Sequence, residues 1–476
     1  MLPAIPDHAL TELGRTEGGP HALALLVRAQ DTRRLLALRA VLDAATEADP
    51  RLCPPPARRR LKEDWALMEA ADATTPRPAD SPARERLLHP LVGPWAQRCL
   101  TLLRTDPARP GAQERGRQLA YELGHFSALA AAAAARAGLP FDSRLTARDG
   151  HLGLPSLGAL RTSAPDGTMY EVTCKYGQLK LRERGSAPVV VRLERGTGAW
   201  SDDPAWTSAY ALPGLTEGAG PTPLDDLDPY RAAEGGAHYR GASEPLALDD
   251  AERKRWLHAW SGTAVELRLG GEQRLTEAVA LLRCLVPLTA PPGSDPFDAT
   301  AGTCSGTRRE AFGAVLSSTP PTAPVFAATL VHELQHTKLL AVAQLVPLHR
   351  AGGAARYFAP WRPDPRPFDG LLQGAYSHLA LADFFQRRAL RVGRTAERES
   401  AWAVHARCKA QVGAALPAVV GSTDLTPQGR RLVDQMVATY ERLDEHPPPR
   451  GHAARARAYV DAARTLFSAR RMRSTG

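Results

Sequence analysis

The chain has few cysteines, and their spacing matches neither a metal ribbon nor a disulfide framework. The six cysteines are Cys53, Cys99, Cys174, Cys284, Cys304 and Cys408. No two of them form a C-x-x-C pair, and a chain of 476 residues does not need disulfides to stabilise a small core. The pattern therefore argues against a zinc ribbon or a disulfide framework and indicates reduced cytosolic thiols.

Long uninterrupted apolar runs are also missing. The longest, "FSALAAAAAARAGL", is dominated by alanine and broken by polar residues, so it does not predict a membrane span. The N-terminus, "MLPAIPDHALTELGRTEGG", lacks a basic segment followed by an apolar stretch, which argues against a secretion signal. We therefore expect a cytoplasmic protein that does not bind a membrane.

Aromatic residues are scarce where a nucleic-acid surface would need them. The formal net charge is +9, but arginines are spread along predicted helices beside aspartate and glutamate. Short basic clusters such as "ARRRLK" contain no interleaved aromatic residue. We interpret the charge as a solvated surface and expect no nucleic-acid partner, while a basic groove for an acidic peptide stays an alternative.

Hydrophobic periodicity predicts a mainly helical α+β fold. Apolar residues recur every three or four positions in residues 21–45 and 112–138, as in long helices, and alternate with polar ones in 165–200, as in a small antiparallel sheet. We therefore predict four regions: an N-terminal helical region (1–145), a mixed region with the small sheet and a long loop (146–299), a metal-binding core (300–392) and a C-terminal helical region (393–476).

Shorter segments give weaker predictions. The Gly/Pro/Asp-rich stretch at 201–246 predicts a loop, and "TAVELRL" at 263–269 predicts a short strand. "EAVALLRCLVPL" at 277–288 fits either a helix or a strand, and "SGTRREAFGAVLSS" at 305–318 predicts a strand at a sheet edge.

The segment "VHELQHTKLL" at 331–340 contains the pattern His-Glu-x-x-His. It lies inside a predicted helix with Thr322 as a candidate N-cap and Pro347 as a stop. Residues four apart share a helix face, so His332 and His336 can bind one metal ion, while Glu333 lies beside them. A chance match is the alternative, but unpaired polar groups are costly in so apolar a helix.

A catalytic metal needs a third protein ligand. The metzincin extension is absent because Leu339 and Val342 occupy its Gly and His positions. We prefer His378 as the third ligand, although a histidine satisfied inside the core is the plainer interpretation. The alternative ligands are the carboxylates Asp383, Glu397 and Glu399. His349 is a less suitable candidate because it is expected to lie in a loop.

Two kinds of enzyme fit this motif. A peptidase needs Zn²⁺ and Glu333 as general base. An oxygenase needs Fe(II) with open coordination positions, and it needs a cation that binds the co-substrate carboxylate. Arg362 or Arg366 in "APWRPDPRPFDG" could be this cation. The alternative is that both arginines form surface ion pairs. Trp361 and Tyr357 nearby would either wall the pocket or anchor the loop.

The sequence resembles the HExxH-motif peptide-modification family of ribosomal peptide natural-product pathways. The resemblance rests on "AFGAVLSSTPP", "TLVHELQHTKL", "LVPL" and "YFAPWRPDPRPFDGLLQGAYSHLALADFF", and on the opening "ALALLVRAQDTRRLLALRAVLDAA". It covers most of the chain, strongest at 300–390 and weakest at 150–245.

The resemblance implies a non-haem Fe(II)- and 2-oxoglutarate-dependent oxygenase that β-hydroxylates a ribosomally made precursor peptide with O₂. It implies iron on His332 and His336, with a third ligand matched here to His378. Gln373 stands where a histidine would also be typical, which leaves the third ligand open. In this chemistry Glu333 orients a ligand or water instead of acting as a base. The peptide could join the 165–200 sheet as an added strand.

The implied partners are the precursor peptide, with its leader and core, and in some pathways a radical-SAM enzyme. The alternatives are a zinc metallopeptidase acting on a similar peptide and a non-catalytic peptide-binding scaffold.

Overall fold

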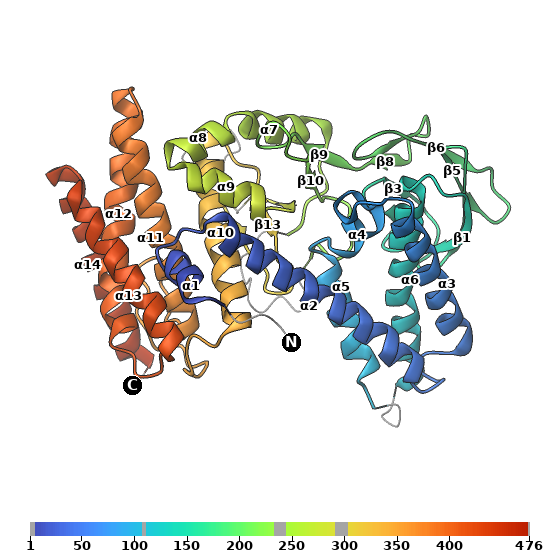
Figure 1. The fold of residues 1–476 in the computed structure, drawn as a ribbon, viewed down its shortest axis with the longest axis horizontal. Helices are drawn as coiled ribbons and strands as arrows, with labels where there is room; N and C mark the ends of the chain where they lie inside the picture. Colours follow the sequence, from blue (N-terminus) through green and yellow to red (C-terminus); the bar gives the residue numbers. More distant parts are fainter. Residues whose placement is uncertain (1–4, 107–110, 233–243, 291–302, 475–476) are drawn as a thin grey trace.

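The chain folds into a mainly helical α+β structure, as the periodicity predicts. A computed structural model describes residues 5–106, 111–232, 244–290 and 303–474. The C-terminal helices pack together at one end of an elongated molecule, and the β-rich part lies at the other (Figure 1). The long helix α2 (Pro20–Glu47) runs between the two ends. Within the described residues, no helix is both long enough and apolar enough to cross a membrane.

Helices make up most of the fold. Besides α2, the α-helices and 3₁₀ helices (η) are α1 (Asp7–Gly14), α3 (Pro55–Ala73), η1 (Pro78–Asp80), α4 (Pro82–Leu87), α5 (Val92–Leu103), α6 (Ala112–Arg136), α7 (Asp250–Ser261), α8 (Thr263–Leu269), α9 (Glu272–Leu281), α10 (Ala323–Leu345), α11 (Phe368–Arg391), α12 (Thr395–Val420), α13 (Pro427–Arg442), η2 (Leu443–Glu445) and α14 (Arg450–Ser474). The two long helices predicted at 21–45 and 112–138 are confirmed as α2 and α6.

In the described part of the chain, three sheets lie between and beside these helices. The strands are β1 (Phe141–Thr146), β2 (His151–Leu154), β3 (Gly158–Arg161), β4 (Met169–Lys175), β5 (Gln178–Glu183), β6 (Val189–Leu193), β7 (Ala199–Trp200), β8 (Trp206–Ser208), β9 (Tyr210–Leu212), β10 (Thr222–Leu224), β11 (Cys284–Leu288), β12 (Ser305–Gly306) and β13 (Ala314–Ser318). The sheet orders are β1-β4-β5-β6-β7, β2-β3-β8 and β12-β13-β11-β10-β9. The first sheet is antiparallel and confirms the sheet predicted at 165–200.

The mixed sheet separates two apolar cores. In β13, Ala314 and Leu316 belong to the core built with the N-terminal helices, whereas Val315 belongs to the core of α10 and α11. This alternation follows from the two-residue period of a strand. β11 and β13 are parallel neighbours, with Cys284 opposite Ala314, and both are buried along their whole length.

The apolar cores do not follow the four predicted regions. One core joins helices near the N-terminus to residues as distant as Leu443, and a second joins Leu38 to Leu316. A third packs the alanine-rich face of α6 against the first sheet. The boundary predicted at 299/300 lies outside the described residues, and the division into regions stays a prediction.

Two of the local predictions were wrong, and one was right in part. Residues 263–269 form the helix α8, not a strand, because Thr263 and Leu267 are buried four positions apart and Thr263 Oγ1 donates to the Ala259 carbonyl. The stretch 305–318 contains β12, the edge strand of its sheet, as predicted, and also β13, which lies inside the sheet. The expected loop contains β8, β9 and β10, and its residues 233–243 lie outside the described part.

The ambiguous segment 277–288 contains both kinds of structure. It holds the end of α9 and then β11, separated by Leu282 in an extended conformation. The cysteines Cys53, Cys99, Cys174, Cys284 and Cys408 are buried free thiols, as their spacing predicts.

Candidate functional site

The helix α10 carries the His-Glu-x-x-His pattern near its middle. Thr322 occupies the N-cap position in an extended conformation, although its side chain makes no capping hydrogen bond, and Pro324 lies in the first turn. The helix ends at Leu345, and the extended Val346 leads into Pro347. These limits agree with the helix predicted from the sequence.

His332 and His336 converge as their spacing predicts. Their Nε2 atoms lie 3.2 Å apart, and their ring centroids 4.8 Å. Two imidazole nitrogens bound to one ion at roughly 2.0–2.1 Å would be about 3 Å apart, so this pair has the separation that a shared metal requires. Burial, reinforced by His336, lowers the pKa of His332 to about 3, so its ring is neutral, the form that binds metal.

Gln373 from α11 fixes the orientation of His336. Its Oε1 lies 3.1 Å from His336 Nδ1 and can only accept a hydrogen bond, so His336 carries its proton on Nδ1. The Nε2 lone pair then points toward His332. Metal-bound histidines commonly have such a partner on the second ring nitrogen. Gln373 therefore lies at the site, but as a partner of His336.

His378 lies beside the pair without closing on it. Its ring centroid is 5.3 Å from that of His332, and its Nδ1 donates to the Gly374 carbonyl at 2.9 Å, which leaves Nε2 as a lone pair. Trp361 stacks on His378 with centroids 4.6 Å apart, so it walls this side of the site. Burial lowers the pKa of His378 to about 3.

The other third-ligand candidates are engaged elsewhere. Asp383 forms ion pairs with Arg274 and Arg387. Glu397 lies near Arg388 and Arg394, Glu399 pairs with His452, and His349 lies 3.3 Å from Asp369. None of these contacts brings a carboxylate to the histidine pair.

The carboxylate of Glu333 is fixed by two hydroxyl groups. Ser305 Oγ donates to Oε1 at 2.7 Å and Thr307 Oγ1 donates to Oε2 at 2.6 Å, and only 2% of the residue is exposed. Oε1 also lies 3.8 Å from His332 Nδ1, too long for a hydrogen bond. Both oxygens of Glu333 are thus held by hydroxyl groups of the segment that contains β12.

The two expected co-substrate arginines face a common acid. Arg362 lies 3.3 Å and Arg366 3.5 Å from Asp364 oxygens, and both side chains are partly exposed. These are the surface ion pairs that were the alternative to a binding role. Their loop nevertheless reaches the site through Trp361.

Several residues of the site had no recognisable signal in the sequence. Ser377 Oγ lies 2.9 Å from His332 Nε2, and Ser305 and Thr307 come from the neighbouring strand segment. Arg407 on α12 is an exposed cation near enough to His378 to lower its pKa further. Only the positions of α11, α12 and β12 around α10 bring these residues together.

A second cluster contains three groups of metal-binding type. His89, Asp225 and Cys284 place one ligand atom each within 4.8 Å of one another, and no other described trio of His, Cys, Asp or Glu does so. His89 Nδ1 accepts from the Leu91 N–H at 3.3 Å, so the proton lies on Nε2 and points to Asp225 Oδ2 at 2.9 Å. Burial and Asp225 raise the Cys284 pKa well above its ordinary value, so the thiol stays protonated. The three groups are joined to one another by hydrogen bonds and remain the described trio whose spacing could hold a metal.

Comparison with known proteins adds nothing to this geometry. No protein-family model and no curated protein matches the chain.

Proposed function

We propose that this protein is an Fe(II)- and 2-oxoglutarate-dependent oxygenase that β-hydroxylates residues of a ribosomally made precursor peptide in the cytoplasm. The observation that carries the choice of oxygenase is the position of Glu333. A metallopeptidase needs this carboxylate free to take a proton from a metal-bound water. Here both of its oxygens accept hydrogen bonds from Ser305 and Thr307.

We assign the following roles to residues of the chain. His332 and His336 hold the metal, and Gln373 keeps the His336 lone pair directed at it. His378, with its Nδ1 proton given to Gly374, is the proposed third ligand. Bound Fe(II) would supply O₂ activation coupled to conversion of 2-oxoglutarate to succinate and CO₂, one oxygen atom entering the peptide and the other the succinate.

A cation is needed for the distal carboxylate of 2-oxoglutarate. Arg362 and Arg366 are the candidates from the sequence. Either one would have to leave its ion pair with Asp364 in order to bind the carboxylate of the co-substrate. Arg407 is a third candidate because it lies near His378 and, among the described residues, has no salt bridge. Substituting each by glutamine separates them, since loss of the binding cation should raise the KM for 2-oxoglutarate.

The test is anaerobic reconstitution of the full chain with Fe(II), followed by 2-oxoglutarate, O₂ and the precursor peptide encoded beside its gene. We expect the peptide to gain the mass of one oxygen atom and an equal amount of succinate to form, and His336→Ala to abolish both. Cleavage of the peptide with Zn²⁺ and no co-substrate would establish the peptidase instead. Bound but unchanged peptide under both conditions would indicate a scaffold.

A further inference from the structure

His89, Asp225 and Cys284 come together from three segments of the chain. His89 follows α4, Asp225 follows β10, and Cys284 begins β11. The two strands are parallel neighbours with Leu224 opposite Leu285, and the Asp225 N–H donates to the Leu285 carbonyl at 2.7 Å. The backbone of the mixed sheet therefore holds Asp225 close to Cys284.

The spacing of the three side chains is close to that of ligands around one ion. Nε2 of His89 lies 2.9 Å from Oδ2 of Asp225, and the three ligand atoms all lie within 4.8 Å of one another. Zinc binds nitrogen and oxygen at roughly 2.0–2.2 Å and sulfur at about 2.3 Å, so its tetrahedral ligand atoms are about 3–4 Å apart. Small movements of the side chains would place all three on one ion.

The types of ligand atom favour zinc over the other common divalent cations. An imidazole nitrogen, a carboxylate oxygen and a thiolate sulfur are the three kinds of donor that zinc uses in proteins. Calcium and magnesium bind oxygen ligands, and iron(II) binds a given site of this kind less tightly than zinc does. The trio therefore suits Zn²⁺.

Zinc would take the places of the protons that now join these groups. Nε2–H of His89 points at Asp225, and the Cys284 thiol is protonated. On metal binding the thiol proton would leave for solvent, and the ring proton would move to Nδ1 of His89. The cost is the contact of Nδ1 with the Leu91 N–H, which at 3.3 Å is a long hydrogen bond.

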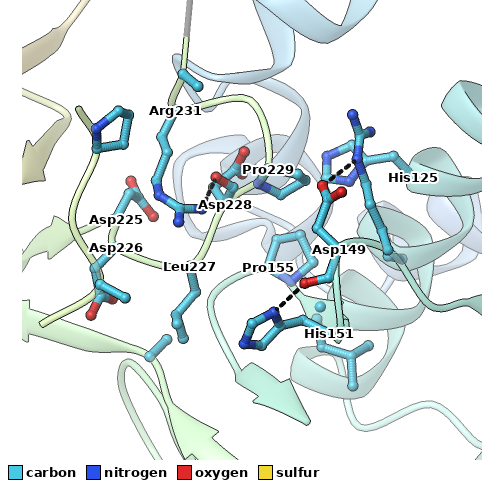
Figure 2. Close-up of a pocket in the computed structure, with 18 of the residues that line it drawn as sticks. His125, Asp149, His151, Pro155, Asp225, Asp226, Leu227, Asp228, Pro229 and Arg231 are labelled. Atoms are coloured by element: carbon cyan, nitrogen blue, oxygen red, sulfur yellow. Dashed lines mark hydrogen bonds and ion pairs between the residues drawn. The ribbon is translucent and has the colours of Figure 1, made fainter. Parts of the chain in front are cut away.

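A second carboxylate lies close to the trio. Asp228 follows Asp225 by three residues on the segment after β10 (Figure 2). It accepts a hydrogen bond from the Tyr230 N–H at 2.7 Å, and among the described residues no cation forms a salt bridge with its carboxylate. Burial and the neighbouring Asp225 raise the pKa of Asp228. An ion bound to Asp225 would relieve the repulsion between the two carboxylates.

The arginines near the trio have other partners. Arg34 donates to backbone carbonyls, and Arg86 pairs with Glu85. Within the part of the chain that the structure describes, the salt bridge of Asp225 is with His89. No guanidinium group therefore takes the position that an ion would need.

One side of the trio faces a cavity. A pocket of about 650 Å³ lies between α6, β2 and the segment that follows β10, and both Asp225 and Asp228 line it (Figure 2). Cys284 is fully buried and the His89 side chain is 8% exposed, whereas the Asp225 side chain is 19% exposed. An ion held by the three residues would thus have its remaining position toward the pocket. Catalytic zinc sites keep such a position open, whereas structural sites fill it with a fourth protein ligand.

We propose that His89, Asp225 and Cys284 bind one Zn²⁺ whose fourth coordination position opens into this pocket, where water or a donor atom of a small molecule completes the shell. The site contains neither His332 nor His336. It goes beyond the proposed function and does not depend on it.

The test uses Co²⁺ as the probe, because a cobalt–thiolate bond gives a near-ultraviolet charge-transfer band. The full chain carrying His332→Ala and His336→Ala is titrated anaerobically, so that the pair on α10 cannot contribute. We expect one cobalt per chain with a thiolate band, about one proton released per ion, and displacement of cobalt by an equivalent of Zn²⁺. If this double variant does not fold, the band is measured in the original chain, since His332 and His336 supply no sulfur.

Variants of the ligands locate the ion. Cys284→Ala should abolish the thiolate band. Loss of an outer partner typically costs roughly 10–100-fold in metal affinity, so Asp225→Asn should weaken zinc binding about a hundredfold or more and Asp228→Asn about tenfold. Cys408→Ala removes another buried free thiol and is the matched control, which should keep the band. Thermal unfolding checks that each variant is folded.

Azide tests the open position, because its binding in place of water changes the visible bands of cobalt. Unchanged visible bands with excess azide would show that the fourth position is closed. Absence of a thiolate band, a band that persists in folded Cys284→Ala, or unchanged zinc affinity in folded Asp225→Asn would overturn the zinc site itself.

Discussion

Glu333 is the residue at which the oxygenase and peptidase interpretations give opposite expectations. Its substitution by glutamine keeps the size and an acceptor for Ser305 or Thr307 but removes the base. We predict that Glu333→Gln keeps hydroxylation within about threefold, whereas loss of a general base typically costs 10²–10⁴-fold. The measurement is the initial rate of succinate formation in the presence of peptide.

The control for this experiment is His336→Ala, which should lose bound iron as well as activity. Metal content measured on both variants separates the two effects. A Glu333→Gln protein that retains iron but loses more than a hundredfold in rate would contradict the assigned role of Glu333.

Side chains close in sequence to the motif were predictable, and those from distant segments were not. His332 and His336 follow from four-residue spacing on a helix. Ser305 and Thr307 precede Glu333 by 28 and 26 residues and reach it only because β12 packs against α10. A lone serine or threonine has no spacing that marks it as a partner of a buried carboxylate.

The side of α10 away from the histidine pair is held by a buried ionic network. Lys338 Nζ lies 2.6 Å from Glu277 and 3.0 Å from the Thr16 carbonyl, and Arg274 joins Glu277 to Asp383. The network therefore connects the segment after α1 with α9, α10 and α11. Removing one charged member leaves the charge of its partner buried with less compensation.

We predict that Lys338→Met lowers the free energy of unfolding by about 3–5 kcal/mol, because it breaks a buried ion pair from one side. Urea denaturation at pH 7 measures the loss. Lys254→Met, at an exposed position on α7, is the matched control and should change stability by less than about 0.5 kcal/mol. Equal stability of the two variants would show that the network contributes little.

The packing of α12 on α11 creates a pH dependence through His405. This residue is fully buried, its Nδ1 donates to the Ala382 carbonyl at 2.8 Å, and its Nε2 has no partner among the described residues. Burial lowers its pKa from 6.5 to about 4. Below pH 6.5 the unfolded chain takes up this proton and the folded chain does not, so stability falls as the pH drops from 6.5 to 4.

The size of this effect is on the order of 3 kcal/mol across that range, from about 1.4 kcal/mol per pKa unit. His405→Asn keeps a donor for Ala382 but does not titrate, so it should lose less stability between pH 7 and pH 4.5 than the original chain. Unfolding free energies at the two pH values provide the comparison. Identical losses in both proteins would assign the acid sensitivity to other groups.

Secondary structure was predictable where the periodic pattern was long. The helices α2 and α10 repeat apolar residues over many turns, so their limits agree with the prediction. The seven residues of α8 are too few to distinguish a helical from a strand pattern. Their helical form depends on burial of Thr263 and Leu267 against neighbouring helices.

The whole molecule is joined by α2, which contributes to two apolar cores. Leu26 belongs to the core of α10 and α11, and Leu38 to the core of the N-terminal helices. Arg283, just after α9, also binds Asp31 of α2 through two hydrogen bonds of 2.6 and 2.9 Å. The two cores therefore share one rigid element.

We predict that Leu26→Ala and Leu38→Ala each destabilise the protein by about 2–5 kcal/mol and shift one common unfolding transition. Tryptophan fluorescence and far-UV circular dichroism should give coincident denaturation curves for both variants. Leu25→Ala, at a less completely buried position of the same helix, should cost less. A separate early transition in Leu38→Ala alone would show that the two cores unfold independently.

The sequence by itself determined the fold class, the long helices, the antiparallel sheet and the convergence of His332 with His336. These features depend on periods of two and 3.6 residues, which local geometry sets without help from the rest of the chain. Tertiary structure alone decided where the partners of Glu333 come from and how His378 lies against Trp361. Each of these joins segments far apart in sequence, and their meeting depends on how the helices and sheets pack.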